Sequence, residues 1–310
     1  GTNRFNRYTV GKATTGLANY LLAAFGAETC KTRGVAVCYD TRNHSREYAE
    51  TVADILSGKG IRVFLFHDAR PTPQLSFSVK HLGAIAGVNI TASHNPAKYN
   101  GYKVYDEHGC QVVPWQAEQI IAFVNQVEDY RTIKFAGDSA LIEHVDVTDE
   151  FVHAVFKQQR ITDVAAKQNL KVVYTPLHGT GLVPVTKMLA EDGFTHISLV
   201  EAQTTPDGDF PTVEFPNPEY RSALKMGVDQ AKAEGADIVL GNDPDADRVG
   251  VGVRFHDETT GEDDYRLLTG NQIGALLVDF LLSHTDLSKI AKPAVVKTVV
   301  TSELGALIAK

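Results

Sequence analysis

The sequence predicts an α/β protein made of two similar, mainly parallel sheets with helices on both faces, followed by the start of a third unit. Segments typical of strands alternate with segments typical of helices, which is the order that builds parallel sheets covered by helices. The alternation pauses once, over a polar stretch at 129–146 that we interpret as a linker, and then restarts. A length of 310 residues with 43% hydrophobic content is enough for at least two domains.

The first predicted unit spans residues 1–145 and begins with a helix. Val10, Leu17 and Leu21 recur at helical spacing, so an amphipathic helix is expected over 9–25. The predicted order of the remaining elements is strand 34–39, helix 45–58, strand 62–66, helix 73–82, strand 84–91, strand 102–106 and a helix from Pro114.

The second predicted unit spans residues 146–265 and repeats the architecture of the first. In each unit a strand preceded by Gly-Ala leads into a polar loop and then into another strand. Loops at such places tend to form the sites of α/β proteins, so we expect both to carry function. The predicted elements are helix 149–159, strand 171–175, helix 181–190, strand 196–200, helix 218–234, strand 237–241 and strand 248–255.

A third unit is predicted over residues 266–310, its first strand beginning at the boundary. A helix at 270–283, a strand at 294–300 and a last helix are expected in it. No Gly or Pro ends this last helix before Lys310, and we expect the chain to be an N-terminal piece of a longer protein.

Charge and composition argue against several classes of protein. The net charge of −8 disfavours binding to nucleic acid or to an acidic membrane, because the summed field repels polyanions. The sequence has neither an apolar run long enough for a membrane span nor a signal-peptide pattern. Cys30, Cys38 and Cys110 lack disulfide or metal-ligand spacing, which favours reduced thiols in a cytoplasmic protein.

An acidic loop, GNDPDADR at 241–248, follows a predicted buried strand. Pro244 excludes a regular helix, and in an extended loop Asp243, Asp245 and Asp247 lie on one side. Each close pair of carboxylates would repel by about 4 kcal/mol at an effective dielectric of 20, so the cluster needs a cation. Hard oxygen ligands with room for water or phosphate favour Mg²⁺.

The acidic loop has three other interpretations: an EF-hand, a solvated turn and a phosphatase site. An EF-hand fails, because Arg248 and Arg254 stand where it requires Gly and Glu. A solvated acidic turn is the plain structural alternative. A phosphatase with Asp243 as its nucleophile stays open as a functional one.

A second polar loop, TASHNPAKYNG at 91–101, places Ser93 just after another predicted strand. Two turn signals, Asn95-Pro96 and Asn100-Gly101, favour an exposed serine. Nearby cations could stabilise a phosphoryl group on this hydroxyl, so Ser93 is a candidate nucleophile or phosphoryl carrier. The alternative is a strand-to-turn connection in which Ser and Asn cap backbone groups.

The common cofactor and hydrolase motifs are missing from the sequence. No hydrolase elbow surrounds Ser93, and no nucleotide-binding G-x-x-x-x-G-K-[ST] motif occurs. The best dinucleotide-binding candidate, HGTGLVP at 178–184, has Pro184 in place of its third glycine. Ordinary kinase and dehydrogenase functions therefore lose most of their support.

Taken together, the motifs resemble those of one family, the α-D-phosphohexomutases, over essentially the whole chain. TASHNP at 91–96 is similar to the family's phosphoserine loop, and GNDPDADR to its Mg²⁺ loop. Further similar strings, in family order, are YDTR at 39–42, NGYKVY at 100–105, TPLHGTG at 175–181 and PDGDFPTVEFPNPE at 206–219.

The resemblance implies a role for each candidate residue. Ser93 would carry the phosphoryl group and, together with Asp243, Asp245 and Asp247, would bind Mg²⁺, which neutralises charge on the transferred group.

Lys103 would be the general acid/base on the sugar hydroxyl, with a pKa lowered by burial beside cations; its structural alternative is a salt bridge. His94 and Arg248 would orient the phosphoserine. Arg42 and His178 would contribute to substrate or phosphate binding, although His178 could instead cap the next helix.

The implied activity is interconversion of glucose 1-phosphate and glucose 6-phosphate, with glucose 1,6-bisphosphate as intermediate and activator. Tyr102 before Lys103 favours a phosphoglucomutase or phosphopentomutase over a phosphomannomutase. The family's sugar loop and C-terminal phosphate loop are absent from these 310 residues, so we expect the chain alone to be inactive. A non-catalytic sugar-phosphate-binding protein remains an alternative, and the sequence does not indicate an oligomeric state.

Overall fold

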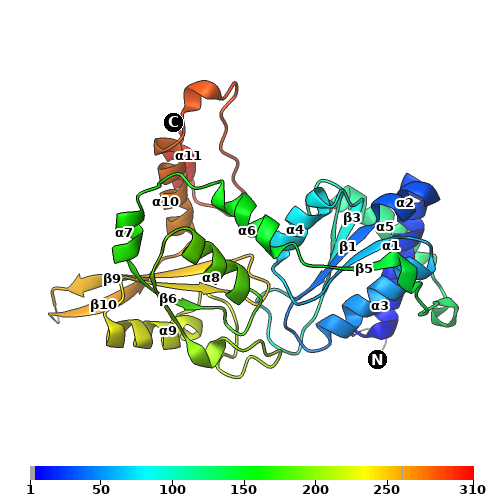
Figure 1. Cartoon of the computed structure of the whole chain (residues 1–310), viewed down its shortest axis with the longest axis horizontal. Coiled ribbons are helices and arrows are strands. Elements are labelled where there is room, and N and C mark those ends of the chain that lie inside the picture. Colours follow the sequence, from blue (N-terminus) through cyan, green and yellow to red (C-terminus); the bar gives the residue numbers. More distant parts are fainter. Residues whose placement is uncertain (1–3, 260) are drawn as a thin grey trace.

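Two five-stranded mixed sheets lie side by side, each covered by helices (Figure 1). The computed structural model describes residues 4–259 and 261–310. The α/β class predicted from the sequence is confirmed.

The first sheet has the strand order β4-β3-β1-β2-β5. Its central strand β1 pairs in parallel with β2 and β3, β2 pairs in parallel with β5, and only β4 runs antiparallel to its neighbour. Every residue of β1, β2 and β3 is buried, as expected of strands covered on both faces. The bounds are β1 Val35–Tyr39, β2 Val63–Phe66, β3 Ala86–Ile90, β4 Tyr102–Tyr105 and β5 Ile142–Val145.

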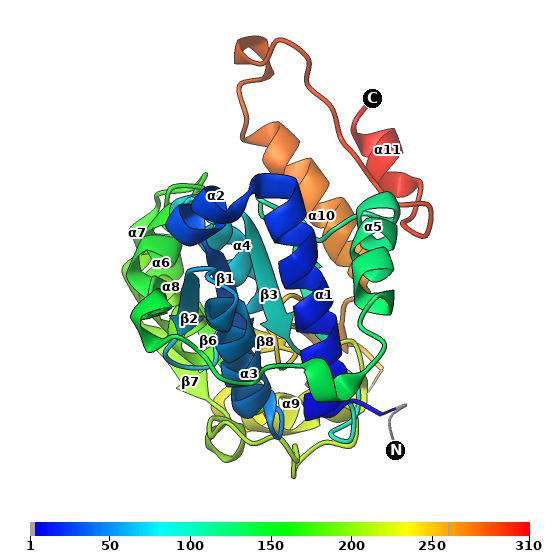
Figure 2. The same cartoon turned by 90° about the vertical axis from the view of Figure 1, so that its right-hand side faces the viewer.

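Helices cover both faces of this sheet, and alternate residues of β1 point to each. Val35 and Val37 pack with α1 and α3, which lie side by side in Figure 2, whereas Ala36 and Cys38 pack with α4. Each face therefore has its own apolar core. The helices are α1 Arg7–Phe25, α2 Ala27–Arg33, α3 Ser45–Gly58, α4 Thr72–His81 and α5 Pro114–Asn125.

The second sheet has the order β10-β9-β8-β6-β7. Strand β6 pairs in parallel with β7 and β8, and β9 and β10 continue the sheet in antiparallel pairing. The strands are β6 Lys171–Thr175, β7 His196–Leu199, β8 Ile238–Asn242, β9 Val249–Asp257 and β10 Glu262–Leu267. The helices are α6 Thr148–Phe156, α7 Val164–Asn169, α8 Leu182–Glu191, α9 Arg221–Glu234, α10 Gly270–Ser283 and α11 Leu304–Ile308. Helix α6 contacts both α4 and α8 and so bridges the two sheets.

The sequence suggested that the polar stretch at 129–146 is a linker, but only part of it is one. Its last residues form β5, which pairs with β2 at the edge of the first sheet. An edge strand is covered less than a central one and can retain polar residues, here Glu143 and His144. The polar composition of this segment is therefore the reason why β5 was not predicted from the sequence.

The strand predicted to open a third unit belongs instead to the second sheet. Strand β10 pairs antiparallel with β9 as the edge strand, so the second unit extends past the predicted boundary at 265. The apolar run at 294–300 forms no strand among the described residues, and Val296 and Val299 are 93% and 98% exposed. An apolar run becomes a strand only where a partner strand satisfies its backbone, and the described part of the chain supplies none.

Within the described ranges, no helix combines the length and hydropathy required to cross a lipid bilayer.

Candidate functional site

The two polar loops meet between the sheets. One follows β3 and carries Ser93; the other follows β8 and carries Asp243. The Ser93 hydroxyl donates a hydrogen bond to Asp243 Oδ2 over 3.0 Å, although 150 residues separate the two in sequence. Both loops leave the carboxyl ends of central parallel strands, where α/β sheets commonly place their sites.

The backbone at Ser93 is held in an unusual conformation. Its φ of 53° lies in the left-handed region, which costs a non-glycine residue free energy. The Ser93 N–H donates to Thr91 Oγ1 over 2.9 Å, which stabilises the turn, and Ser93 Oγ lies 3.1 Å from His94 Nδ1. The serine oxygen therefore lies between an imidazole and the acidic loop.

The three aspartates of the acidic loop form a compact cluster. One carboxylate oxygen from each of Asp243, Asp245 and Asp247 lies within 4.8 Å of the others. The side chains of Asp243 and Asp245 are fully buried. Burial, followed by the charges of Asp245 and Asp247, raises the pKa of Asp243 well above its usual range. Without a cation, Asp243 therefore tends to keep its proton.

The cluster fits a hard divalent cation. Asp245 Oδ1 is buried and has no hydrogen-bond partner in the described part of the chain, a costly state for a carboxylate oxygen. A cation bound by the three aspartates would satisfy this atom and offset their mutual repulsion. Their carboxylate oxygens are the ligands that Mg²⁺ prefers.

Lys103, on β4, forms ion pairs with the acidic cluster. Its Nζ lies 2.9 Å from Asp245 Oδ2 and 3.4 Å from Asp247 Oδ2. Burial by itself would lower the pKa of Lys103, but the charge and hydrogen bond of Asp245 and the charge of Asp247 outweigh it and raise the pKa. The expected lowering of this pKa is therefore wrong, because the lysine faces carboxylates rather than cations.

His94 and Arg248 flank the Ser93–Asp243 contact. Burial and then the charge of Arg248 lower the pKa of His94, which favours the neutral imidazole beside Ser93. The Arg248 N–H donates to Asp243 Oδ1 over 3.0 Å, while its partly exposed guanidinium lies 4.0 Å from Asp243 Oδ2. Both side chains lie within reach of a group attached to the serine.

Arg42 lies behind the serine loop, with its side chain completely buried. Its guanidinium contacts Asp40 at 3.2 Å and donates to four backbone carbonyls of the loop. These acceptors are Ser93 and Asn95 at 2.5 Å, Pro96 at 3.0 Å and Tyr99 at 3.1 Å. This geometry makes Arg42 a support for the loop, and its predicted contact with phosphate gains no support from it.

Replacing Arg42 with methionine is expected to lower the free energy of unfolding by about 3 kcal/mol, because buried Asp40 and the loop carbonyls lose their partner. Urea denaturation measures this change. Arg46→Met is the matched control, since Arg46 pairs with Glu50 on the surface and should cause little change. Equal free energies of unfolding for the Arg42 variant and the wild type would show that the hydrogen bonds from Arg42 do not stabilise the loop.

His178 is buried in the second unit. Its Nδ1 lies 3.0 Å from the Thr205 carbonyl and its Nε2 2.9 Å from Thr212 Oγ1. Both ring nitrogens are thus used to hold the 205–212 loop. The structure does not bring this residue into the Ser93–Asp243 cluster, so its predicted role in binding substrate stays a prediction.

Two residues that sequence reasoning missed also contact the site. Thr72, the first residue of α4, donates from its hydroxyl to Asp245 Oδ2 over 2.8 Å, and Asn89 of β3 donates to Thr72 Oγ1 over 2.6 Å. Neither residue belongs to a recognisable motif. Their only local signal is that they are polar residues in or next to predicted elements.

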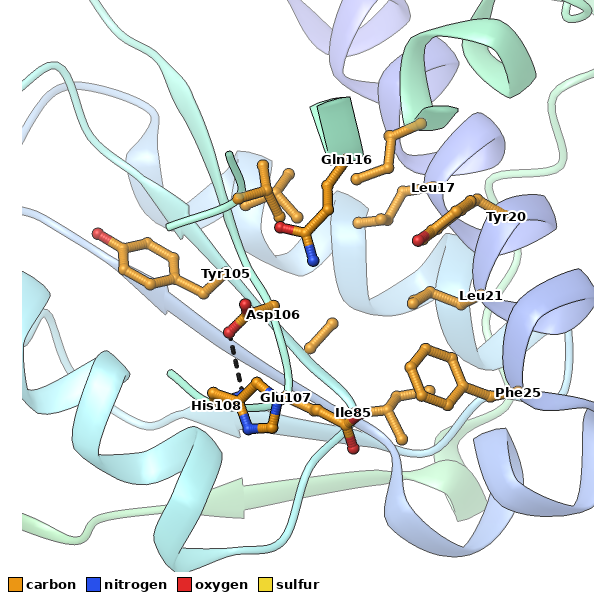
Figure 3. Close-up of a pocket in the computed structure, with 14 residues that line it drawn as sticks. Leu17, Tyr20, Leu21, Phe25, Ile85, Tyr105, Asp106, Glu107, His108 and Gln116 are labelled. Carbon is orange, nitrogen blue, oxygen red and sulfur yellow. Dashed lines mark hydrogen bonds between the residues drawn. The ribbon is translucent and has the colours of Figure 1, made fainter. Parts of the chain in front are cut away.

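A separate cavity of about 90 Å³ lies between α1, α5 and the turn after β4 (Figure 3). Leu17, Leu21 and Phe25 form its apolar side, while Asp106 accepts a hydrogen bond from the His108 N–H at its polar side. None of the predicted site residues lines it. This cavity is therefore separate from the two polar loops.

The fold and site define a class of protein in which two α/β/α units place a serine loop against a three-aspartate loop. Models of the phosphoglucomutase/phosphomannomutase α/β/α domains I and II match residues 1–131 and 149–255, in that order. The chain belongs to this family, the α-D-phosphohexomutases, as its motifs suggested.

Individual relatives agree with this assignment. The chain is 34% identical to the phosphoglucomutase of Staphylococcus saprophyticus and 35% identical to that of Staphylococcus haemolyticus, in each case over 100% of this chain and 55% of the relative. It thus spans about half the length of these curated relatives. A Thermus thermophilus protein provisionally assigned as a phosphomannomutase has the same fold, with a TM-score of 0.74 and 22% identity over 98% of this chain and 63% of that one.

Proposed function

We propose that this chain carries the phosphoserine and metal loops of a phosphoglucomutase-type isomerase, which interconverts glucose 1-phosphate and glucose 6-phosphate. The observation that carries the proposal is the 3.0 Å contact between Ser93 Oγ and Asp243. This contact supports the proposal because phosphoryl transfer requires a carrier group close to a metal site, here the proposed roles of Ser93 and the acidic loop. Curated relatives named phosphoglucomutase, at about 35% identity, support this choice of sugar.

In the proposed reaction, a phosphate on Ser93 Oγ is transferred to a sugar hydroxyl. The hydroxyl oxygen attacks phosphorus, the electron pair of the broken bond from phosphorus to Ser93 Oγ stays on that oxygen, and the neutral form of Lys103 accepts the hydroxyl proton. The glucose 1,6-bisphosphate so formed turns around and returns its other phosphate to Ser93. His94 and Arg248, which flank the serine, orient the phosphoryl group.

Mg²⁺ bound by Ser93, Asp243, Asp245 and Asp247 would supply the positive charge that stabilises the transferring phosphoryl group. The same carboxylates raise the pKa of Lys103. Neutralising them therefore removes the main reason why this lysine holds its proton so firmly. This link between the two groups supports Lys103 as the acid/base residue.

Two other functions of the acidic loop receive less support. The Asp243 carboxylate is fully buried and has a raised pKa, both of which disfavour it as the nucleophile of a phosphatase. A non-catalytic sugar-phosphate-binding protein would not need a strained serine beside a metal loop. Within the family, mannose or pentose phosphates remain alternative substrates of the complete protein.

The proposal is tested by incubating the chain with glucose 1,6-bisphosphate and Mg²⁺ and locating the phosphate by peptide mass spectrometry. We expect label on Ser93, a single transfer that does not complete the mutase cycle. Label on Asp243 would instead establish the phosphatase. In the complete protein, mannose 1-phosphate and ribose 1-phosphate as competing acceptors test the sugar preference.

We also expect a particular partner, activity and cellular location for this chain. A small sugar phosphate is the expected partner, and lack of turnover by these 310 residues alone stays a prediction. A cytoplasmic location is consistent with Cys30, Cys38 and Cys110, which are free thiols.

A further inference from the structure

A hydrogen-bonded path of buried polar groups joins the first sheet to the acidic loop of the second. Thr72 contacts Asp245 twice: its N–H donates to the Asp245 carbonyl over 2.8 Å, and its hydroxyl donates to Oδ2 over 2.8 Å. Thr72 is only 6% exposed, and Asp245 is fully buried. The backbone and the side chain of this aspartate are therefore both held from the other unit.

Asn89 determines the direction of the Thr72 hydroxyl. Its Nδ2 donates to Thr72 Oγ1 over 2.6 Å, from a fully buried position on β3. A hydroxyl has one proton, and here the amide already supplies the proton on that side. The Thr72 proton is consequently left to point at Asp245 Oδ2.

The two carboxylate oxygens of Asp245 therefore differ in their hydrogen bonding. Oδ2 accepts from Thr72 at 2.8 Å and from Lys103 at 2.9 Å. Oδ1 is buried and has no partner in the ranges that the structure describes. The carboxylate is clamped by one oxygen while the other remains available for a ligand.

We propose that Thr72 and Asn89 are positioning residues that orient Asp245 for a divalent cation and link occupation of the metal loop to the contact between the two units. The inference rests on the proposed metal site and adds to it the groups that preorganise it. Such outer groups lower the cost of arranging ligands at the moment of binding. Neither residue touches the reacting atoms.

The test is isothermal titration of the 310-residue chain with Mg²⁺ alone, which requires no turnover. Thr72→Val keeps the shape of the side chain but removes the hydroxyl, and we expect Mg²⁺ to bind about tenfold more weakly, since a hydrogen bond to a charged group is worth about that factor. Thr72→Ser should restore the affinity, because it restores the hydroxyl. Thr14→Val, which removes a buried hydroxyl on α1, is the matched control and should bind Mg²⁺ as the wild type does.

Asn89→Leu is a second variant for the same Mg²⁺ titration, and it serves if Thr72→Val does not fold. Asn89 Oδ1 is buried with no partner among the described residues, so leucine also removes an unsatisfied polar atom and should be tolerated. We expect a several-fold loss of Mg²⁺ affinity with the fold retained in circular dichroism. Unchanged affinity in folded Thr72→Val or Asn89→Leu would overturn this inference alone, whereas a wild type that does not bind Mg²⁺ would overturn the metal site as well.

Discussion

Replacing Ser93 with alanine is expected to abolish transfer of phosphate from glucose 1,6-bisphosphate to the chain, by more than about 1,000-fold. The reason is direct: the hydroxyl oxygen that would form the bond to phosphorus is missing. The fold should survive, because the Ser93 side chain is only partly buried and, among the residues that the structure describes, its hydroxyl hydrogen-bonds only with His94 and Asp243. Intact-mass measurement after a timed incubation follows the added phosphate.

A matched control shows whether the effect is specific to the Ser93 hydroxyl or follows from removing any serine hydroxyl. Ser78→Ala removes a buried hydroxyl that donates to the Gln74 carbonyl within α4, and it should take up phosphate at the wild-type rate. The Ser93 variant should also still bind Mg²⁺, since the three aspartates remain. Phosphate uptake by Ser93→Ala at the wild-type rate would show that another residue carries the group.

Replacing Asp243 with asparagine is expected to weaken Mg²⁺ binding by at least about 100-fold, because one of three converging negative charges is lost in a buried site. Asparagine has nearly the same shape, so the metal-free fold should be retained. Its melting temperature should not fall, because the neutral amide resembles the protonated carboxyl that the raised pKa of Asp243 favours in the metal-free protein. Calorimetric titration and thermal melts with and without Mg²⁺ measure both effects.

The same variant should also weaken the pH dependence of Mg²⁺ binding. In the wild type, burial and the neighbouring carboxylates raise the pKa of Asp243, so a cation must displace its proton. Affinity for Mg²⁺ should therefore rise with pH, and the rise should be smaller in Asp243→Asn. The control Asp229→Asn changes an exposed ion pair with Lys225 and should leave affinity and pH dependence unchanged. Equal Mg²⁺ affinity in Asp243→Asn and wild type would exclude Asp243 as a ligand.

Much of the architecture could be predicted because its determinants are local. Strand β1 is a short apolar run buried on both faces, β6 is buried after its exposed first residue, and α3 has a regular amphipathic pattern, so their bounds agree with the prediction to within a residue. The edge strands β5 and β10 were missed or assigned to the wrong unit. Their pairing partners, rather than their own residues, decide where they belong.

For the candidate site, the sequence by itself determined which groups are present: a serine after one strand and three alternating aspartates after another. Spacing within a loop is enough to predict that the aspartates converge. Only the tertiary structure decided what these groups meet. It turned Lys103 towards carboxylates, placed Arg42 behind the serine loop and set Thr72 against Asp245. The physical reason is that pKa shifts and hydrogen-bond partners depend on distances across two separate sheets, and no local pattern of residues encodes those distances.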